Sequence, residues 1–139
     1  MFDTLLKFIK ECQTNNESVC VGGDFNKTLG DRDGGLTRLC TEANLININH
    51  NRHRIDTQSF NTHKRGNKCI DCTLVDPRLA ESVEACGHEP FNVRILGDHR
   101  GVHMDVHTAM SFGSQTPPLA SADSRQLKSR VVSQTVPHF

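Results

Sequence analysis

A chain of 139 residues can form one domain with its own core, and its length gives no reason to expect two. Only 35% of the residues are apolar and 5% aromatic, with no Trp and no Tyr, which is little material for a self-sufficient core and suggests a fragment. Sixteen basic and sixteen acidic residues cancel, so overall charge does not attract the chain to nucleic acid or to an anionic membrane.

Two helices and a strand are expected in the first third of the chain. Apolar residues at helical spacing predict a helix over residues 2–12, with Asp3 placed to cap it. The short apolar run over residues 18–21 ends in two glycines, as is typical of a strand covered on both faces. Helical spacing returns over residues 36–43, where Asp33 is placed to supply the cap.

The rest of the chain is expected to hold short strands and a tail. The candidate strands are residues 45–48, 57–61, 68–75, 82–85 and 102–106. Beyond Phe112 the chain turns to Ser, Gln and Pro with few clustered apolar residues, which cannot offset the entropy of ordering. We therefore expect a domain over residues 1–112 and a disordered tail over residues 113–139.

Membrane insertion and secretion are not expected. No stretch approaches the roughly 18 apolar residues of a membrane span, and the N-terminus lacks the basic flank and apolar core of a signal peptide. We therefore expect an intracellular protein whose cysteines are mostly buried free thiols rather than a disulfide framework. The cysteines are Cys12, Cys20, Cys40, Cys69, Cys72 and Cys86.

A zinc-binding module is one alternative interpretation of these cysteines. Cys69 and Cys72 form a CxxC pair, and Cys86 and His88 follow at a tolerable distance. If residues 68–75 form a strand, however, positions three apart face opposite sides of the sheet and cannot share an ion. We therefore predict that this pair does not bind zinc.

Three segments place polar side chains where a site could form. In GGDFN, Asp24 and Asn26 follow a predicted strand, a site-like position that an ordinary turn also explains. In IDCTL, Asp71 interrupts an apolar strand, so it either faces water or meets a partner. In GDHRG, Asp98 and His99 share a loop whose glycine would let both approach one site, although a surface turn is the alternative.

Taken in order, GGDFN, IDCTLVD and LGDHRGV resemble the second half of the endonuclease/exonuclease/phosphatase family, which includes the DNase I-like nucleases. The resemblance covers residues 19–106 and includes the aromatic-bearing segment Ser59-Phe60. Residues 35–39 and 64–66 are also similar to the endonuclease domains of non-long-terminal-repeat retroelements. An α/β (α+β) fold is implied, with this chain forming roughly one sheet and its helices within a four-layer α/β sandwich.

The resemblance implies hydrolysis of a phosphodiester with Mg²⁺, or Mn²⁺, as cofactor. Asp24 would orient or deprotonate the attacking water, and the Asn26 amide would hold water and a phosphate oxygen. His99 would donate to the phosphate oxygen or assist proton transfer, and Asp71 would hold its other nitrogen. Asp98 would bind or orient the ion. We therefore predict that these five residues converge in one pocket, with Asp71 within hydrogen-bond reach of His99.

The implied substrate is a nucleic acid, although nuclease and phosphatase cannot be separated at this point. Basic residues in two stretches could contact backbone phosphates, or could be solvated loop charges. The stretches are Arg52-His53-Arg54 and His63-Lys64-Arg65 with Lys68.

The sequence departs from the family pattern in three ways. Gly97 stands where the family usually has Ser, and Cys72 where it usually has Tyr. Family members also carry a metal-binding Glu and an Asn in a first half, and nothing before Ser18 resembles those motifs. We therefore expect impaired activity unless a missing N-terminal half is supplied, and a catalytically inactive remnant or interaction fragment is the alternative.

Overall fold

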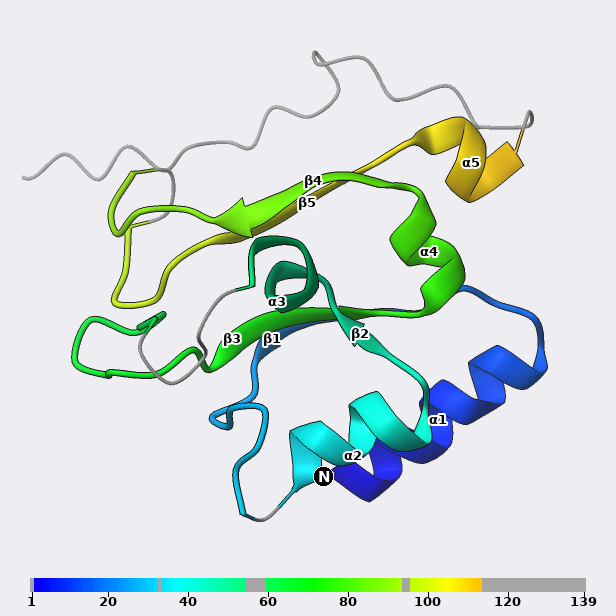
Figure 1. Cartoon of the computed structure of the whole chain (residues 1–139), viewed down its shortest axis with the longest axis horizontal. Helices are drawn as coiled ribbons and strands as arrows, with labels where there is room; N and C mark the ends of the chain where they lie inside the picture. The colour runs from blue at the N-terminus through cyan, green and yellow to red at the C-terminus, as the bar shows by residue number, and fades with distance from the viewer. Residues whose placement is uncertain (1, 33, 55–59, 94–95, 114–139) are drawn as a thin grey trace, which may run out of the picture.

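A computed structural model describes residues 2–32, 34–54, 60–93 and 96–113, which combine helices with antiparallel strands in small sheets, an α+β arrangement (Figure 1). The helices are α1 (Phe2–Thr14), α2 (Gly35–Glu42), α3 (Ile48–His53), α4 (Pro77–Glu81) and α5 (Thr108–Phe112). The strands are β1 (Cys20–Asp24), β2 (Ile46–Asn47), β3 (Asp71–Val75), β4 (Val83–His88) and β5 (Val102–Val106).

The larger sheet has three antiparallel strands in the order β1-β3-β2. All five residues of β3 are buried, including the polar Asp71 and Thr73, because β3 is the central strand of the sheet. The register pairs Cys20 with Val75 at one end and Asp24 with Asp71 at the other. This register brings two carboxylate-bearing residues, far apart in sequence, to the same end of the sheet.

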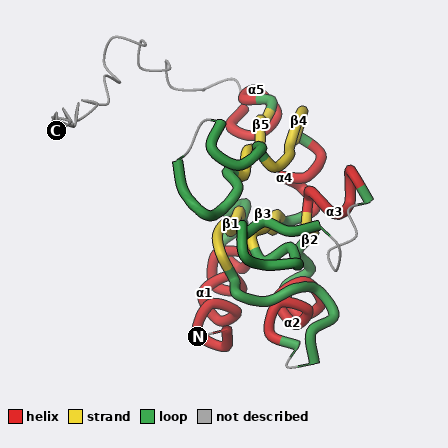
Figure 2. The backbone as a smooth tube through the Cα atoms, turned by 90° about the vertical axis from the view of Figure 1, so that its left-hand side faces the viewer, coloured by secondary structure: helices red, strands yellow, loops and turns green. Residues whose placement is uncertain are grey.

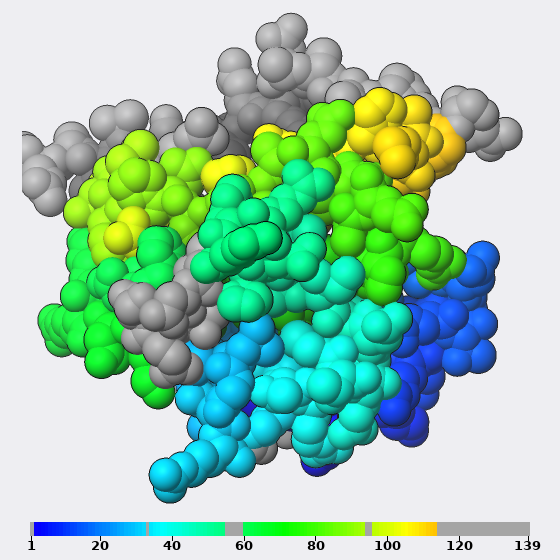
Figure 3. Space-filling model, viewed as in Figure 1, coloured from blue at the N-terminus to red at the C-terminus, as the bar shows by residue number. Residues whose placement is uncertain are grey.

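Helices and a hairpin cover the two sides of this sheet. Figures 1 and 2 show α1 and α2 on one side and the β4-β5 hairpin on the other. In the space-filling view of Figure 3, α3 (blue-green) lies above α2 (cyan) on the face turned to the reader. No helix in the described part of the chain is long and apolar enough to cross a membrane.

Two apolar clusters lie on either side of β3. The first joins α1 and α2 to the sheet and includes Ile9, Leu39 and Leu74. The second joins α3, the end of β3 and β4 through Ile48, Val75, Val83 and Cys86. Alternate side chains of a strand point to opposite faces, which explains why Leu74 and Val75 belong to different clusters.

The two helices predicted in the first third of the chain are present, but the predicted role of Asp3 as a cap is wrong. α1 begins at Phe2, so Asp3 lies inside its first turn, where it pairs with Arg38 at 2.9 Å instead of capping. α2 is preceded by Gly34 at φ 66°, a conformation that favours glycine, and Gly34 has no side chain with which to cap the helix. The predicted cap Asp33 lies outside the described residues.

The strand predictions were correct in the second half of the chain and less so in the first. Of the predicted strand over residues 82–85, residues 83–85 fall in β4 and Ser82 precedes it, whereas residues 102–106 match β5. β3 begins only at Asp71, later than predicted. The prediction that residues 18–21 form a strand covered on both faces is wrong, because β1 is an edge strand and most of its residues are exposed. Phe60 and Asn61 are not in a strand, and residues 57–59 lie outside the described part, as do residues 114–139 of the predicted tail.

The strand predicted over residues 45–48 is shorter than expected, because the short helix α3 begins at Ile48. Only Ile46–Asn47 is extended, because the Asn47 side chain accepts a hydrogen bond from the backbone N–H of His50 at 3.1 Å and starts α3. Asp76 caps α4 in the same way, accepting from Leu79 N at 2.8 Å with Pro77 at the first helical position.

The central position of β3 leads to a prediction about stability. Leu74 is 0% exposed, so Leu74→Ala should lower the free energy of unfolding by about 2–5 kcal/mol, measured by urea denaturation. Met110→Ala is the control, since Met110 is 62% exposed and its truncation should cost less than about 0.5 kcal/mol. Equal losses in the two variants would contradict this description of the core.

Candidate functional site

Asp24 ends β1 and organises the loop that follows it. Its Oδ1 accepts a hydrogen bond from Asn26 N at 2.8 Å, and its Oδ2 accepts one from Asn26 Nδ2 at 3.2 Å. Asn26 adopts φ 52°, which asparagine tolerates in such turns. Phe25 is buried and its N–H donates to Ile70 O at 2.9 Å, which ties the loop to the approach to β3.

Asp71 is the first residue of β3 and lies opposite Asp24 in the sheet. It is only 6% exposed, so its carboxylate needs a partner. That partner is His99, whose Nδ1 lies 3.1 and 3.0 Å from the two Asp71 carboxylate oxygens. The predicted contact between Asp71 and His99 is therefore confirmed, and the interpretation of Asp71 as a solvent-facing carboxylate is wrong.

His99 lies between the two carboxylates of the sheet. Its Nδ1 contacts the Asp71 carboxylate, and its Nε2 lies 3.9 Å from Asp24 Oδ2. The hydrogen bond to Asp71 is the main reason that the pKa of His99 is raised, and the charges of Asp71, Asp24 and Asp98 add to it. A carboxylate that accepts from Nδ1 also fixes the orientation of the ring.

Asp98 lies on the exposed side of His99 and contacts a second imidazole. His63 Nε2 is 3.3 Å from Asp98 Oδ2, and the rings of His63 and His99 meet edge to face with centroids 4.8 Å apart. The backbone amide of Asp98 and then the hydrogen bond from His63 hold the pKa of Asp98 below its usual range. Asp98 is therefore a carboxylate at neutral pH.

The loop that carries Asp98 and His99 is held by its neighbours rather than by its glycine. Gly97 was expected to permit a conformation that brings Asp98 and His99 to one site, but it is not among the residues with positive φ, so the loop does not use the left-handed conformation that favours glycine. The Arg100 guanidinium instead lies over the rings of Phe60 and Phe91, 5.1 and 4.2 Å from their centroids. Its Nε also donates to Asn61 O at 2.8 Å, which fixes the residue next to His99.

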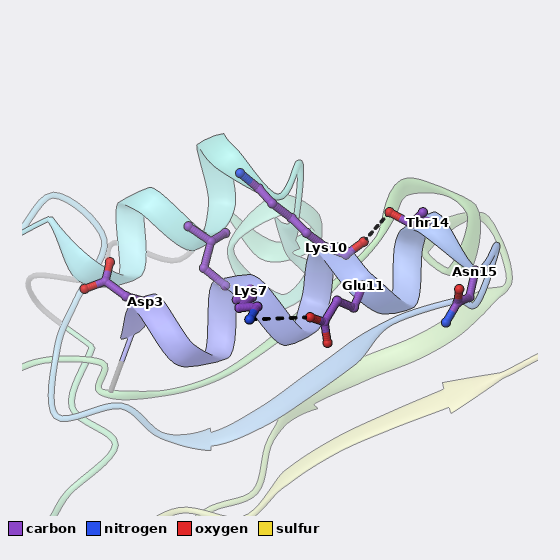
Figure 4. Close-up of a pocket in the computed structure, with 7 residues that line it drawn as sticks. Asp3, Lys7, Lys10, Glu11, Thr14 and Asn15 are labelled. Atoms are coloured by element: carbon purple, nitrogen blue, oxygen red, sulfur yellow. Dashed lines mark hydrogen bonds and ion pairs between the residues drawn. The ribbon is translucent and has the colours of Figure 1, made fainter.

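The five predicted site residues come together, but they do not all line one cavity. A cavity of about 370 Å³ is lined by Gly22, Gly23, Asp71, Thr73 and His99 together with Arg100, Gly101 and Val102. Asp24, Asn26 and Asp98 adjoin this group through the contacts above rather than through the cavity wall. A larger hollow of about 680 Å³ runs along α1 and contains none of the five residues (Figure 4).

Within the described part of the chain, two groups of side chains could hold a metal ion. They are Asp24 with Asp71 and His99, and His63 with Asp98 and His99, each with ligand atoms within 4.8 Å of one another. His99 belongs to both groups. His63 was predicted only as part of a basic stretch that could contact phosphates, because its contact with Asp98 spans 35 positions of the chain.

The basic residues predicted near phosphates have mixed environments. Lys64 Nζ donates to Asn92 Oδ1 at 2.9 Å, Lys68 Nζ lies 3.4 Å from Asp31, and Arg65 is exposed. The stretch from Arg52 to Arg54, interpreted as phosphate contacts or as solvated loop charges, forms the end of α3 and its C-cap. There Arg52 donates to the backbone carbonyls of Val83 and Glu84, and His53 Nε2 to that of Cys86 at 2.7 Å, which gives both a structural role.

The cysteines of the alternative zinc module lie in different surroundings. Cys72 belongs to the first apolar cluster and Cys86 to the second. Cys69 precedes β3, so its predicted place in the strand is wrong, and its Sγ lies 4.0 Å from His88 Nε2. Burial raises the pKa of Cys69 to about 11 and raises that of Cys72 further, which opposes the thiolate form that binds zinc.

Comparison with known proteins adds no relative, since no protein-family model and no curated protein sequence matches this chain.

The different clusters of Cys72 and Cys86 and the raised pKa of the Cys69 and Cys72 thiols predict that Cys72→Ala does not change the zinc content of the purified protein, measured by elemental analysis. Stoichiometric zinc in the unmodified protein that is lost on Cys72→Ala would contradict this expectation.

The contact between Asp71 and His99 predicts a shift in titration, measured by NMR in metal-free buffer. His99 should titrate above the ordinary imidazole value of 6.5, and Asp71→Asn should lower its pKa because the main stabilising partner of the imidazolium is lost. The stabilisation from this pair should be present below pH 6.5 and be lost as pH rises through the raised pKa. Asp105→Asn, at an exposed position of β5, is the control and should leave His99 unchanged.

Proposed function

We propose that this site performs metal-dependent phosphodiester hydrolysis of the endonuclease type. The proposal depends on the arrangement of His99 between two carboxylates. The buried Asp71 holds the His99 ring at Nδ1, and His99 Nε2 faces the Asp24 carboxylate. The three motifs that resemble the endonuclease/exonuclease/phosphatase family supply these residues, and Asp98 lies beside them.

The donor set fits a hard divalent ion such as Mg²⁺ or Mn²⁺. Asp98 is ionised and its side chain is 68% exposed, so it could bind an ion that keeps most of its waters. Such an ion would offset the negative charge that develops on the phosphoryl oxygens.

The chain's own residues would handle the protons and the orientation of the reactants. His99, held by Asp71 and favoured in its protonated form, would donate from Nε2 to a phosphate oxygen or transfer a proton. Asp24 would accept a proton from water or orient it. The Asn26 amide has two N–H donors, so it could keep its bond to Asp24 and still contact a phosphate oxygen.

A nucleic acid is the substrate that we propose for this site. Lys64 adjoins it directly, because its backbone N–H donates to Asp98 O at 2.8 Å, and Arg65 follows on the exposed side. Together with Lys68, these residues could position a phosphate backbone without reading its bases.

Activity of this chain alone is proposed to be low. The resemblance implies a Glu as the main ligand of the ion, and the sequence before Ser18 has no matching motif. Mg²⁺ gives up its waters reluctantly when few ligands replace them.

The test compares nicking of supercoiled plasmid by the chain alone and by the chain fused behind a family first half, each with Mg²⁺. We expect background activity from the chain alone and clear nicking by the fusion. The double variant Asp24→Ala/His99→Ala of the fusion should lose activity by roughly a hundredfold or more.

The matched control is the fusion with Asp105→Ala/His50→Ala, which removes one acid and one imidazole away from the site and should nick normally. Full activity of the fusion after the Asp24→Ala/His99→Ala change would reject the proposed site. Strong Mg²⁺-dependent nicking by the chain alone would instead reject the proposal that its activity is low.

A further inference from the structure

His63 contacts both residues of the Asp98-His99 pair, although the resemblance assigns it no role. Its Nε2 is 3.3 Å from Asp98 Oδ2, and its ring meets the His99 ring edge to face. Its side chain is 24% exposed, whereas that of Asp98 is 68% exposed. The more buried partner in this contact is therefore the imidazole.

Backbone contacts hold the segment that carries His63 against the loop that carries His99. His63 and His99 form an isolated antiparallel bridge, flanked by hydrogen bonds from Lys64 N to Asp98 O and from Arg100 N to Thr62 O, both 2.8 Å. The segment that carries His63 thus moves together with the loop that carries Asp98 and His99.

The hydrogen bonds of His63 also determine its tautomer. The backbone N–H of Arg65 donates to His63 Nδ1 at 3.2 Å, and a backbone N–H can only donate. Nδ1 is therefore the acceptor, and the neutral ring carries its proton on Nε2, from which it donates to Asp98. A protonated Nε2 has no lone pair for a cation, so this arrangement favours His63 as a donor to Asp98 over His63 as a ligand.

We propose that His63 is a positioning residue that donates from Nε2 to one oxygen of Asp98 and so orients the carboxylate toward a divalent cation. This inference rests on the proposed function, which makes Asp98 a ligand. Without His63, an exposed carboxylate would sample several rotamers, and ordering it on binding would weaken affinity. Outer partners of metal ligands commonly act in this way.

The test measures Mn²⁺ affinity of the full chain by electron paramagnetic resonance, which requires no turnover. His63→Phe keeps a ring against His99 but removes the donor, and should weaken Mn²⁺ binding roughly tenfold. His63→Gln keeps an N–H near the position of Nε2 and should bind within about threefold of the unmodified protein. Asp98→Asn should weaken binding at least as much as His63→Phe.

Two further measurements separate positioning from a general structural effect. Ring ¹⁵N shifts should show the Nε2-protonated tautomer of His63 in the metal-free protein. Thermal unfolding should show that the His63 variants remain folded, and His63→Leu replaces His63→Phe as the variant without a donor if the latter does not fold.

The outcomes distinguish this inference from the proposed function. Absence of Mn²⁺ binding, or binding unaffected by Asp98→Asn, would overturn the metal site and the inference together. Binding that depends on Asp98 but is unchanged in His63→Phe and His63→Leu would overturn the inference alone. Equal weakening in the Phe and Gln variants would also overturn it, because the imidazole itself would then be required.

Discussion

The hydrogen bond between Asp71 and His99 is the interaction on which the site depends. A carboxylate that is 6% exposed is costly to bury without a partner, and like charges placed opposite each other on a sheet repel. Asp71 faces both problems, since Asp24 is its cross-strand partner. The His99 ring lies between the two carboxylates, and Asp71 and Asp24 both favour its protonated form, which offsets both costs. This explains why a loop distant in sequence is held against the end of the sheet.

The surrounding contacts keep this loop in place. Thr62 is fully buried, and its hydroxyl accepts from the backbone N–H groups of Ile70 and Asp71 at 3.0 and 3.1 Å. Its carbonyl accepts from Arg100, whose guanidinium is covered by two phenylalanine rings. The same few residues therefore join the start of β3, the segment around His63 and the loop of His99, so that the geometry of the site is set by folding before a ligand arrives.

Sequence patterns could predict the carboxylates but not all of their neighbours. Asp24 and Asp71 were found because each adjoins a short apolar run, and His99 because it stands beside Asp98 between glycines. His63 looked like one member of a basic stretch, since its function depends on a contact across 35 positions. The exposure of β1 depends on strand order, which the local spacing of apolar residues does not encode. α3 was not predicted because the apolar run that precedes Asn47 fits a strand and a helix equally well.

The pairing of β1 with β3 also governs which changes in length the chain can tolerate. A deletion or insertion of one residue between Cys20 and Asp24 would move Asp24 to the opposite face of the sheet, because side chains alternate along a strand. The apolar contacts of α1 and α2 with other parts of the sheet could persist, and the protein could remain folded while the acid pair was lost. By contrast, exposed loop positions such as Asn67 lie outside the helices and strands, where added residues are tolerated more readily. Variation in length among natural or engineered forms of this chain should therefore gather in the loops and avoid the five residues of β1.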